Sequence, residues 1–204
     1  KDLEREIWDG IRLGPEAAPA ELGIEAAFSV DTLAEKMPDL LANQQAVWFP
    51  FATHKGLETT VDGWLNKVRA RVRLGTECPQ SLHDLCQPLD EMRLVKDPHE
   101  IAILRRAGSI SAGAHVRAMQ TSSAMLRNGI EGGLREYHLE AELLHEFRRH
   151  GAQAPAYTSI VAAGANACVL HYRAGNTELK AGQLCLTDAG CELDGYARAI
   201  TRTL

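Results

Sequence analysis

The chain has 204 residues, of which 45% are hydrophobic and 24% are charged, which is enough for one medium domain or two small ones with buried cores. It contains no run of about 18 apolar residues and no basic block, and its formal net charge is −5, so neither a membrane span nor a nucleic-acid partner is expected. The five cysteines form no Cys-x-x-Cys pair and the charged opening Lys1–Glu6 is no signal peptide, which together predict reduced thiols and a cytoplasmic location.

The first part of the chain alternates helix and strand signals. Apolar residues at helical spacing predict a helix over 31–41, and the run Ala46–Phe51 predicts a short buried strand. Over 61–72 the apolar residues recur at i, i+3, i+4 and i+7, which predicts an amphipathic helix. This order of helix, strand and helix is typical of a small α/β domain.

A second domain is predicted to begin with a strongly marked helix. Residues 76–96 contain prolines and turn formers and predict a junction. Asp97 can cap the free N–H groups of the helix, Pro98 suits its first position, and Glu100 can bond back from its third. We expect this helix to end near Met119.

The rest of the chain changes from a helix pattern to strand patterns. An apolar stripe predicts a second helix over Tyr137–His150, with Gly151 as its C-terminal stop. The segments that then read as strands are Thr158–Ala162, Ala167–Tyr172, Gln183–Asp188 and Tyr196–Thr203. Two helices followed by antiparallel strands predict an α+β domain.

The stretch 184–203 predicts a β-hairpin that carries half of a metal site. Apolar residues alternate up to Asp188, and a turn follows at 192–195. If the turn is centred between its second and third residues, position 188 faces position 199, and cross-strand neighbours lie about 5 Å apart. A second carboxylate there would let the pair hold a hard divalent cation, but the residue is Ala199.

This stretch resembles the motif Asp-Ala-Gly-x-Glu-x-x-Gly-Tyr-x-x-Asp-Ile-Thr-Arg-Thr of Xaa-Pro aminopeptidases, the aminopeptidase P group of pita-bread metallopeptidases. Asp188 matches the first aspartate of the motif, Ala199 stands in place of the second, and Arg198 replaces a residue that is usually small. The resemblance extends over nearly the whole chain, which is similar to a middle portion of a full-length member. The other matching segments are Glu6–Arg12, Glu91–Lys96, Glu100–Gly108, Glu136–Glu142, His145–Phe147, Tyr157–Val161 and Leu170–Tyr172.

The resemblance implies a fold and an activity. Residues 1–90 would be the C-terminal part of the family's α/β N-terminal domain, and residues 91–204 the first half of its α+β pita-bread catalytic domain. The implied reaction removes the N-terminal residue from peptides with proline at the second position. Two metal ions, usually manganese, serve this reaction in the family, where they activate a bridging water.

The resemblance also implies roles for three residues. Asp188 would bind metal, and His171 would lie beside the metals, where it contacts substrate or stabilises the transition state. Trp8 matches a tryptophan that reaches a neighbouring subunit's active site in oligomeric members, which implies substrate binding and a homo-oligomer. The family's remaining ligands, a His and two Glu, lie beyond the matched portion, so this chain is expected to be incomplete and inactive.

Two alternatives to this activity stay open. Because Ala199 cannot bind a metal, the chain could instead be a non-catalytic pita-bread protein that binds a partner without metals. It could also carry out metal-free chemistry of the creatinase kind. Asp188 could merely end a strand, and His171 could be a core residue.

Two further features receive no functional role. His145 and His150 are five residues apart, whereas a helical zinc motif needs a spacing of four, so no zinc motif is expected there. His138, Glu142 and His145 share one face of the predicted helix, which is expected to be a solvated polar face. The segment Thr121–Gly133 replaces a short Pro-Gly turn of the family, and no function follows from it.

Overall fold

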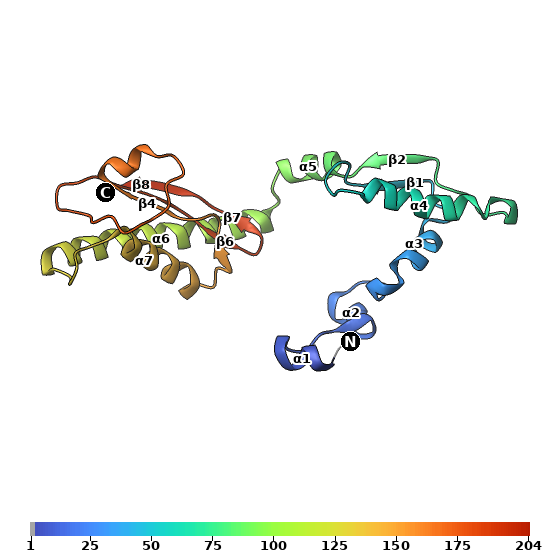
Figure 1. Cartoon of the computed structure of the whole chain (residues 1–204), viewed down its shortest axis with the longest axis horizontal. Helices are drawn as coiled ribbons and strands as arrows, with labels where there is room; N and C mark the ends of the chain where they lie inside the picture. Colours follow the sequence, from blue (N-terminus) through green and yellow to red (C-terminus); the bar gives the residue numbers. More distant parts are fainter. Residues whose placement is uncertain (1–2) are drawn as a thin grey trace. The chain divides into compact units, whose positions relative to one another are not determined.

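The computed structural model describes residues 3–204, and the chain divides into two compact units, Lys1–Val95 and Lys96–Leu204. Figure 1 shows both units with most of their helices and strands labelled. Among the helices of residues 3–204, none combines the length and the apolar character needed to cross a membrane.

The first unit is a small α/β arrangement built around one parallel strand pair. Strands β1 (Ala46–Phe49) and β2 (Ser81–Asp84) pair in parallel, and helix α4 (Leu57–Arg69) connects them as a βαβ crossover. The other elements are α1 (Leu3–Asp9), α2 (Gly14–Leu22), η1 (Val30–Thr32), α3 (Leu33–Leu41), η2 (Val72–Leu74) and α5 (Cys86–Leu94). The buried core consists of Leu41, Phe49, Val61, Leu65 and Val68.

Part of the predicted junction is regular structure. The predicted junction at 76–96 contains the strand β2 and the helix α5, and the two units divide at its end, between Val95 and Lys96. Strand β2 has the sequence Ser-Leu-His-Asp, which lacks a clear apolar alternation, and its pairing with β1 determines its conformation.

The second unit begins with the predicted helix, which is longer than expected. Helix α6 (Pro98–Asn128) opens with the expected capping box: Asp97 accepts from the Glu100 N–H at 2.8 Å, and Glu100 accepts from the Asp97 N–H at 2.7 Å. The helix continues past Met119 because no breaker occurs before Gly129. Most of the segment 121–133 is therefore helix rather than loop.

The second predicted helix is confirmed as α7 (Glu136–Arg149), and Gly151 follows it with φ +88°. Helices α6 and α7 pack against each other and lie together along the strands (Figure 1). Their apolar stripes and the facing strand residues form one core. Its fully or nearly fully buried members include Ala107, Ala114, Leu139, Leu143, Phe147, Val161, Ala189 and Cys191.

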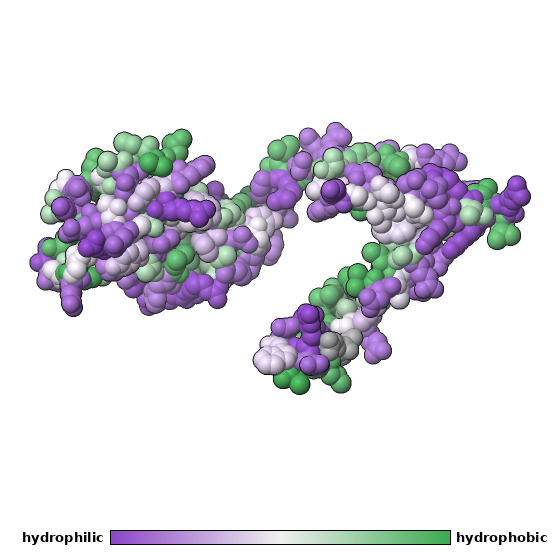
Figure 2. Space-filling model, viewed as in Figure 1, coloured by the Kyte–Doolittle hydropathy of each residue, from purple (hydrophilic) through white to green (hydrophobic). Residues whose placement is uncertain are grey.

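The strands form two small antiparallel sheets. One contains β4 (Ile160–Ala163), β5 (Cys185–Ala189) and β8 (Ile200–Thr203) in the order β4-β5-β8. The other contains β3 (Ala154–Pro155), β6 (Cys191–Leu193) and β7 (Tyr196–Ala197) in the order β3-β6-β7. Apolar side chains remain exposed on both units, where Figure 2 shows green patches among hydrophilic surface.

Candidate metal and catalytic site

The alternation of β5 determines which way Asp188 points. Cys185, Thr187 and Ala189 are buried, whereas Leu186 and Asp188 between them are only half-buried on the opposite face of the strand. On the buried face, Nε2 of His115 from α6 lies 3.1 Å from the carbonyl oxygen of Ala189. The strand is thus held against the helices, and Asp188 projects away from them.

The hairpin register differs from the sequence expectation. Asp194 and Gly195 have φ of +50° and +80°, and they form a two-residue turn that pairs Leu193 with Tyr196. Asp188 therefore faces Thr201, and the prediction that it faces position 199 is wrong because the turn is centred one residue later than assumed. Ala199 becomes a diagonal neighbour of Asp188 on the same face of the sheet, a relation that typically separates Cα atoms by about 7–8 Å.

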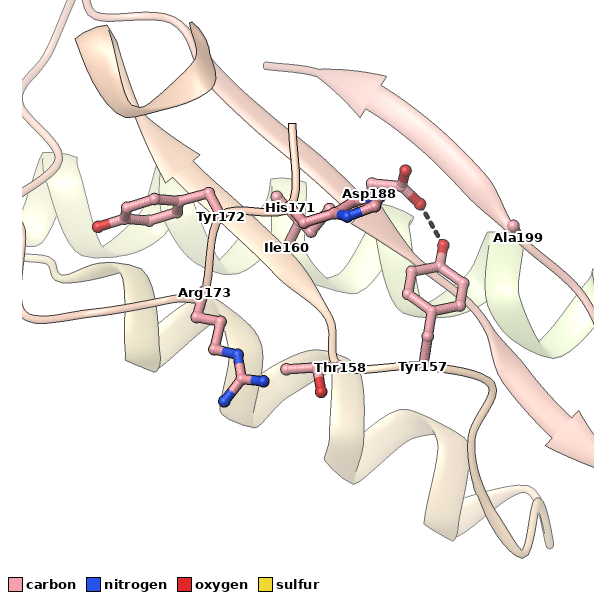
Figure 3. A pocket seen from close by; sticks show the side chains of 8 residues that line it. All are labelled: Tyr157, Thr158, Ile160, His171, Tyr172, Arg173, Asp188 and Ala199. Carbon is pink, nitrogen blue, oxygen red and sulfur yellow. Dashed lines mark hydrogen bonds between the residues drawn. The ribbon is translucent and has the colours of Figure 1, made fainter. Parts of the chain in front are cut away.

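A cavity of about 460 Å³ lies on this face, and Figure 3 shows the side chains around it. It brings together Asp188 and His171, the two site residues predicted in this unit, as well as Ala199. The full lining is Tyr157, Thr158, Ile160, His171, Tyr172, Arg173, Asp188 and Ala199. Trp8 lies on α1 of the other unit with 82% of its surface exposed, and its role stays a prediction.

His171 sits in a turn rather than in a strand. The prediction of a strand over Ala167–Tyr172 is wrong, because the 3-10 helix η3 (Gly164–Cys168) ends immediately before this turn. A single buried carboxylate, Glu136, accepts hydrogen bonds from residues along this loop, which binds the loop to α7 instead of to a sheet. Glu136 was not predicted as a site residue, since its only signal in the sequence is its place at the start of a helix.

Tyr157 is a second residue of the site that was not predicted from the sequence. Its phenol O–H donates to Oδ1 of Asp188, and Figure 3 marks this bond. Burial raises the pKa of Tyr157 well above its ordinary value, and the hydrogen bond to Asp188 raises it further. Tyr157 therefore stays protonated as a donor, and Oδ2 of Asp188 has no hydrogen-bond partner within residues 3–204.

The donor set around the cavity is too small for a two-metal centre. Divalent cations of this hard class take about six oxygen ligands. In the part of the chain that the structure describes, no three His, Cys, Asp or Glu side chains are grouped to hold a metal ion. Asp188 and His171 line the cavity, but position 199 contributes only a methyl group. The residues around the cavity therefore supply too few ligands to coordinate two metal ions by themselves.

Side chains on the polar face of α7 form ion pairs. Nε of Arg117 lies 2.5 Å from Oε2 of Glu142, and Glu146 accepts from His150 at 2.8 Å. Nδ1 of His138 accepts from the backbone N–H of Arg135 at 2.9 Å. The face is polar as expected, but the side chains of Glu142 and Glu146 are only 23% and 13% exposed, so it is less solvated than expected.

The buried carboxylate of Glu136 predicts an acid-sensitive fold. Desolvation would raise the pKa of Glu136, but its hydrogen bonds outweigh this effect and lower the pKa below the ordinary 4.5. Its stabilising contribution is therefore fully present above about pH 4.5, and it is lost as the pH falls through the lowered folded-state pKa. We expect the urea midpoints of the natural chain and of Glu136→Gln to differ at pH 6 and to approach each other as the pH falls below 4.5. A constant difference at all pH values would contradict this.

Comparisons with known proteins agree with this geometry. The profile of metallopeptidase family M24 matches residues 102–204, and that of the aminopeptidase P N-terminal domain matches residues 1–48. The chain is 42% identical over 203 residues to Xaa-Pro aminopeptidase of Escherichia coli (strain K12), and it spans 100% of its own length but 44% of that protein.

Solved structures of aminopeptidase P also resemble this chain. The structure of Pseudomonas aeruginosa aminopeptidase PepP matches with a TM-score of 0.88 and 41% identity, covering 100% of this chain and 44% of that one. A substituted form of E. coli aminopeptidase P in complex with substrate matches with a TM-score of 0.87 and 42% identity, at the same coverage. The fold is that of an aminopeptidase P N-terminal domain portion followed by a pita-bread portion, and the chain belongs to metallopeptidase family M24.

Proposed function

We propose that this chain is part of a metal-dependent aminopeptidase that releases the N-terminal residue from peptides with proline at the second position. The observation that carries the proposal is the cavity in which His171, Asp188 and Ala199 meet. Family M24 is a metallopeptidase family, which implies divalent metal ions, and we propose manganese as the ion. The relatives named Xaa-Pro aminopeptidase support the choice of substrate.

The proposed roles follow the positions of the side chains. Asp188 would be one ligand of a divalent ion through the oxygen that Tyr157 does not occupy. His171, on the rim of the same cavity, would contact the peptide. Trp8 would bind substrate from a neighbouring copy, so we also propose a homo-oligomer. With Ala199 in place of a carboxylate, we propose that this chain alone is inactive.

The remaining parts of the proposal concern organisation and location. Residues 1–90 are assigned to the C-terminal part of the aminopeptidase P N-terminal domain, and residues 91–204 to the first half of the catalytic domain. The matches to residues 1–48 and 102–204 support this assignment. We place the protein in the cytoplasm, with peptides rather than nucleic acids or membranes as partners.

Ala199 specifically favours a second candidate. A pita-bread protein without its bridging aspartate could bind a peptide without cleaving it, or could carry out metal-free chemistry of the creatinase kind. Titration with a non-hydrolysed Xaa-Pro peptide, with and without manganese, distinguishes this second candidate from the metal-dependent aminopeptidase. Binding that is independent of metal would support the second candidate.

A chimera with a complete relative tests the first candidate. This chain would replace the matching 44% of E. coli Xaa-Pro aminopeptidase. We expect the chimera with Ala199 to cleave an Xaa-Pro tripeptide at least about 100-fold more slowly than the chimera with Ala199→Asp, because a direct ligand matters at least as much as its supporting residues. Both chimeras should show the same circular dichroism. Equal activity of the two folded chimeras would contradict the proposed role of position 199.

A further inference from the structure

Glu136 is a fully buried carboxylate at the first position of α7, with 0% of its surface exposed. Its Oε1 accepts from the backbone N–H of Ala163 at 2.8 Å and from the side-chain amide of Asn166 at 2.9 Å. Its Oε2 accepts from the hydroxyl of Tyr172 and from the backbone N–H of Gly175, both at 2.9 Å. All four donors belong to β4 or to the loop after it, and none belongs to α7.

Two residues at the start of α7 hold the far end of the same loop. The backbone N–H of Glu136 donates to the carbonyl oxygen of Thr177 at 3.1 Å, and Nη1 of Arg135 donates to that of Asn176 at 2.8 Å. The loop 164–178 is therefore bound along its length to one helix terminus. The negative charge of Glu136 also lies at the end of the helix where the helix dipole favours it.

Apolar burial contributes little to the middle of this loop. Leu170 is 89% exposed and Val169 is 53% exposed, and His171 itself is exposed. The next residue, Tyr172, carries the hydroxyl that donates to Glu136. Polar contacts, rather than packing, therefore fix the backbone on either side of His171.

We propose that Glu136 is the positioning residue that holds His171 at the cavity that Asp188 lines. The relevance of this role to peptide cleavage rests on the proposed function, but the structural role itself does not. A carboxylate is required because two oxygens must serve four donors. A glutamine offers one acceptor oxygen, and its NH₂ group would face the backbone N–H of either Ala163 or Gly175 and leave that N–H unpaired.

The test uses the whole chain without metal or peptide and compares Glu136→Gln with the matched variant Glu140→Gln. Glu140 lies one turn further along α7 and is half-buried, and its side chain has no hydrogen-bond partner in residues 3–204. Hydrogen exchange read by mass spectrometry should be at least about 10-fold faster over 164–178 in Glu136→Gln, and unchanged there in Glu140→Gln. The proton resonances of the His171 ring, assigned with His171→Gln, should broaden or split only in Glu136→Gln.

A milder variant keeps the proposal testable if Glu136→Gln fails to fold. Tyr172→Phe removes one of the four donors beside His171, so we expect a smaller increase in exchange over 164–178 and the same change in the His171 resonances. Unchanged exchange and an unchanged His171 signal in folded Glu136→Gln, or in Tyr172→Phe, would overturn the proposal. Because neither readout needs catalysis, the predicted exchange together with a folded Ala199→Asp chimera that cleaves no Xaa-Pro tripeptide would refute the proposed function alone.

Discussion

Replacing Gly190 with alanine is expected to destabilise the Lys96–Leu204 unit by at least about 3 kcal/mol. A Cβ atom at this position would lie 1.4 Å from the carbonyl oxygen of Arg198 and 3.0 Å from the Cα of Ala199. These are backbone atoms of the returning strand, so no side chain can rotate away, and the two strands would have to separate. Since a typical domain is stable by only about 5–15 kcal/mol, this change would remove about one fifth to three fifths of the unit's stability.

The measurement must distinguish the two units. All three tryptophans, Trp8, Trp48 and Trp64, lie in the first unit, so their fluorescence reports that unit. Hydrogen exchange over α6 and α7 in increasing urea reports the second. Gly113→Ala is the control, because it is a helical position whose added Cβ meets only Oε1 of Glu146 at 3.9 Å. It should stabilise the unit by about 0.5–1 kcal/mol. A Gly190→Ala chain as stable as the natural one would contradict the close approach of these two strands.

Introducing a second carboxylate with Ala199→Asp is expected to tighten manganese binding to this chain at least about 10-fold, or about 1.4 kcal/mol. Positions 188 and 199 line the same cavity, so two carboxylates there can bind one ion, one from β5 and one from the residue before β8. Without metal, the two negative charges would repel each other, and bound manganese would relieve this repulsion. Calorimetry measures the affinity. The same variant should still cleave no Xaa-Pro peptide, because the chain supplies no group of three metal ligands within residues 3–204.

Two further variants show why Ala199→Asp should raise the affinity for manganese. The double variant Asp188→Asn with Ala199→Asp should lose this increase in affinity, since the two carboxylates act as a pair. Ala70→Asp adds the same charge at an exposed position of the other unit, and it should give no gain. Equal gains from Ala199→Asp and Ala70→Asp would show that the added charge alone attracts the ion.

The local elements and the family could be predicted from the amino-acid sequence. The start of α6 was predictable because its capping box uses neighbouring residues, Asp97 and Glu100. The extent of α7 was predictable because one apolar stripe at helical spacing faces one core. The aminopeptidase P motif around Asp188 was readable because close backbone approaches, as at Gly190, restrict which residues fit.

How these elements meet depends on contacts between distant parts of the chain. One exception is local: the register that places Asp188 opposite Thr201 follows from the turn at Asp194 and Gly195, a dipeptide that favours the positive φ angles of a two-residue hairpin turn. Strand β2 exists because a distant strand pairs with it. The loop that carries His171 takes its shape from Glu136, which lies on the preceding helix. Such long-range contacts leave no periodic pattern in the sequence, so the cavity and the residue that organises its rim became visible only in three dimensions.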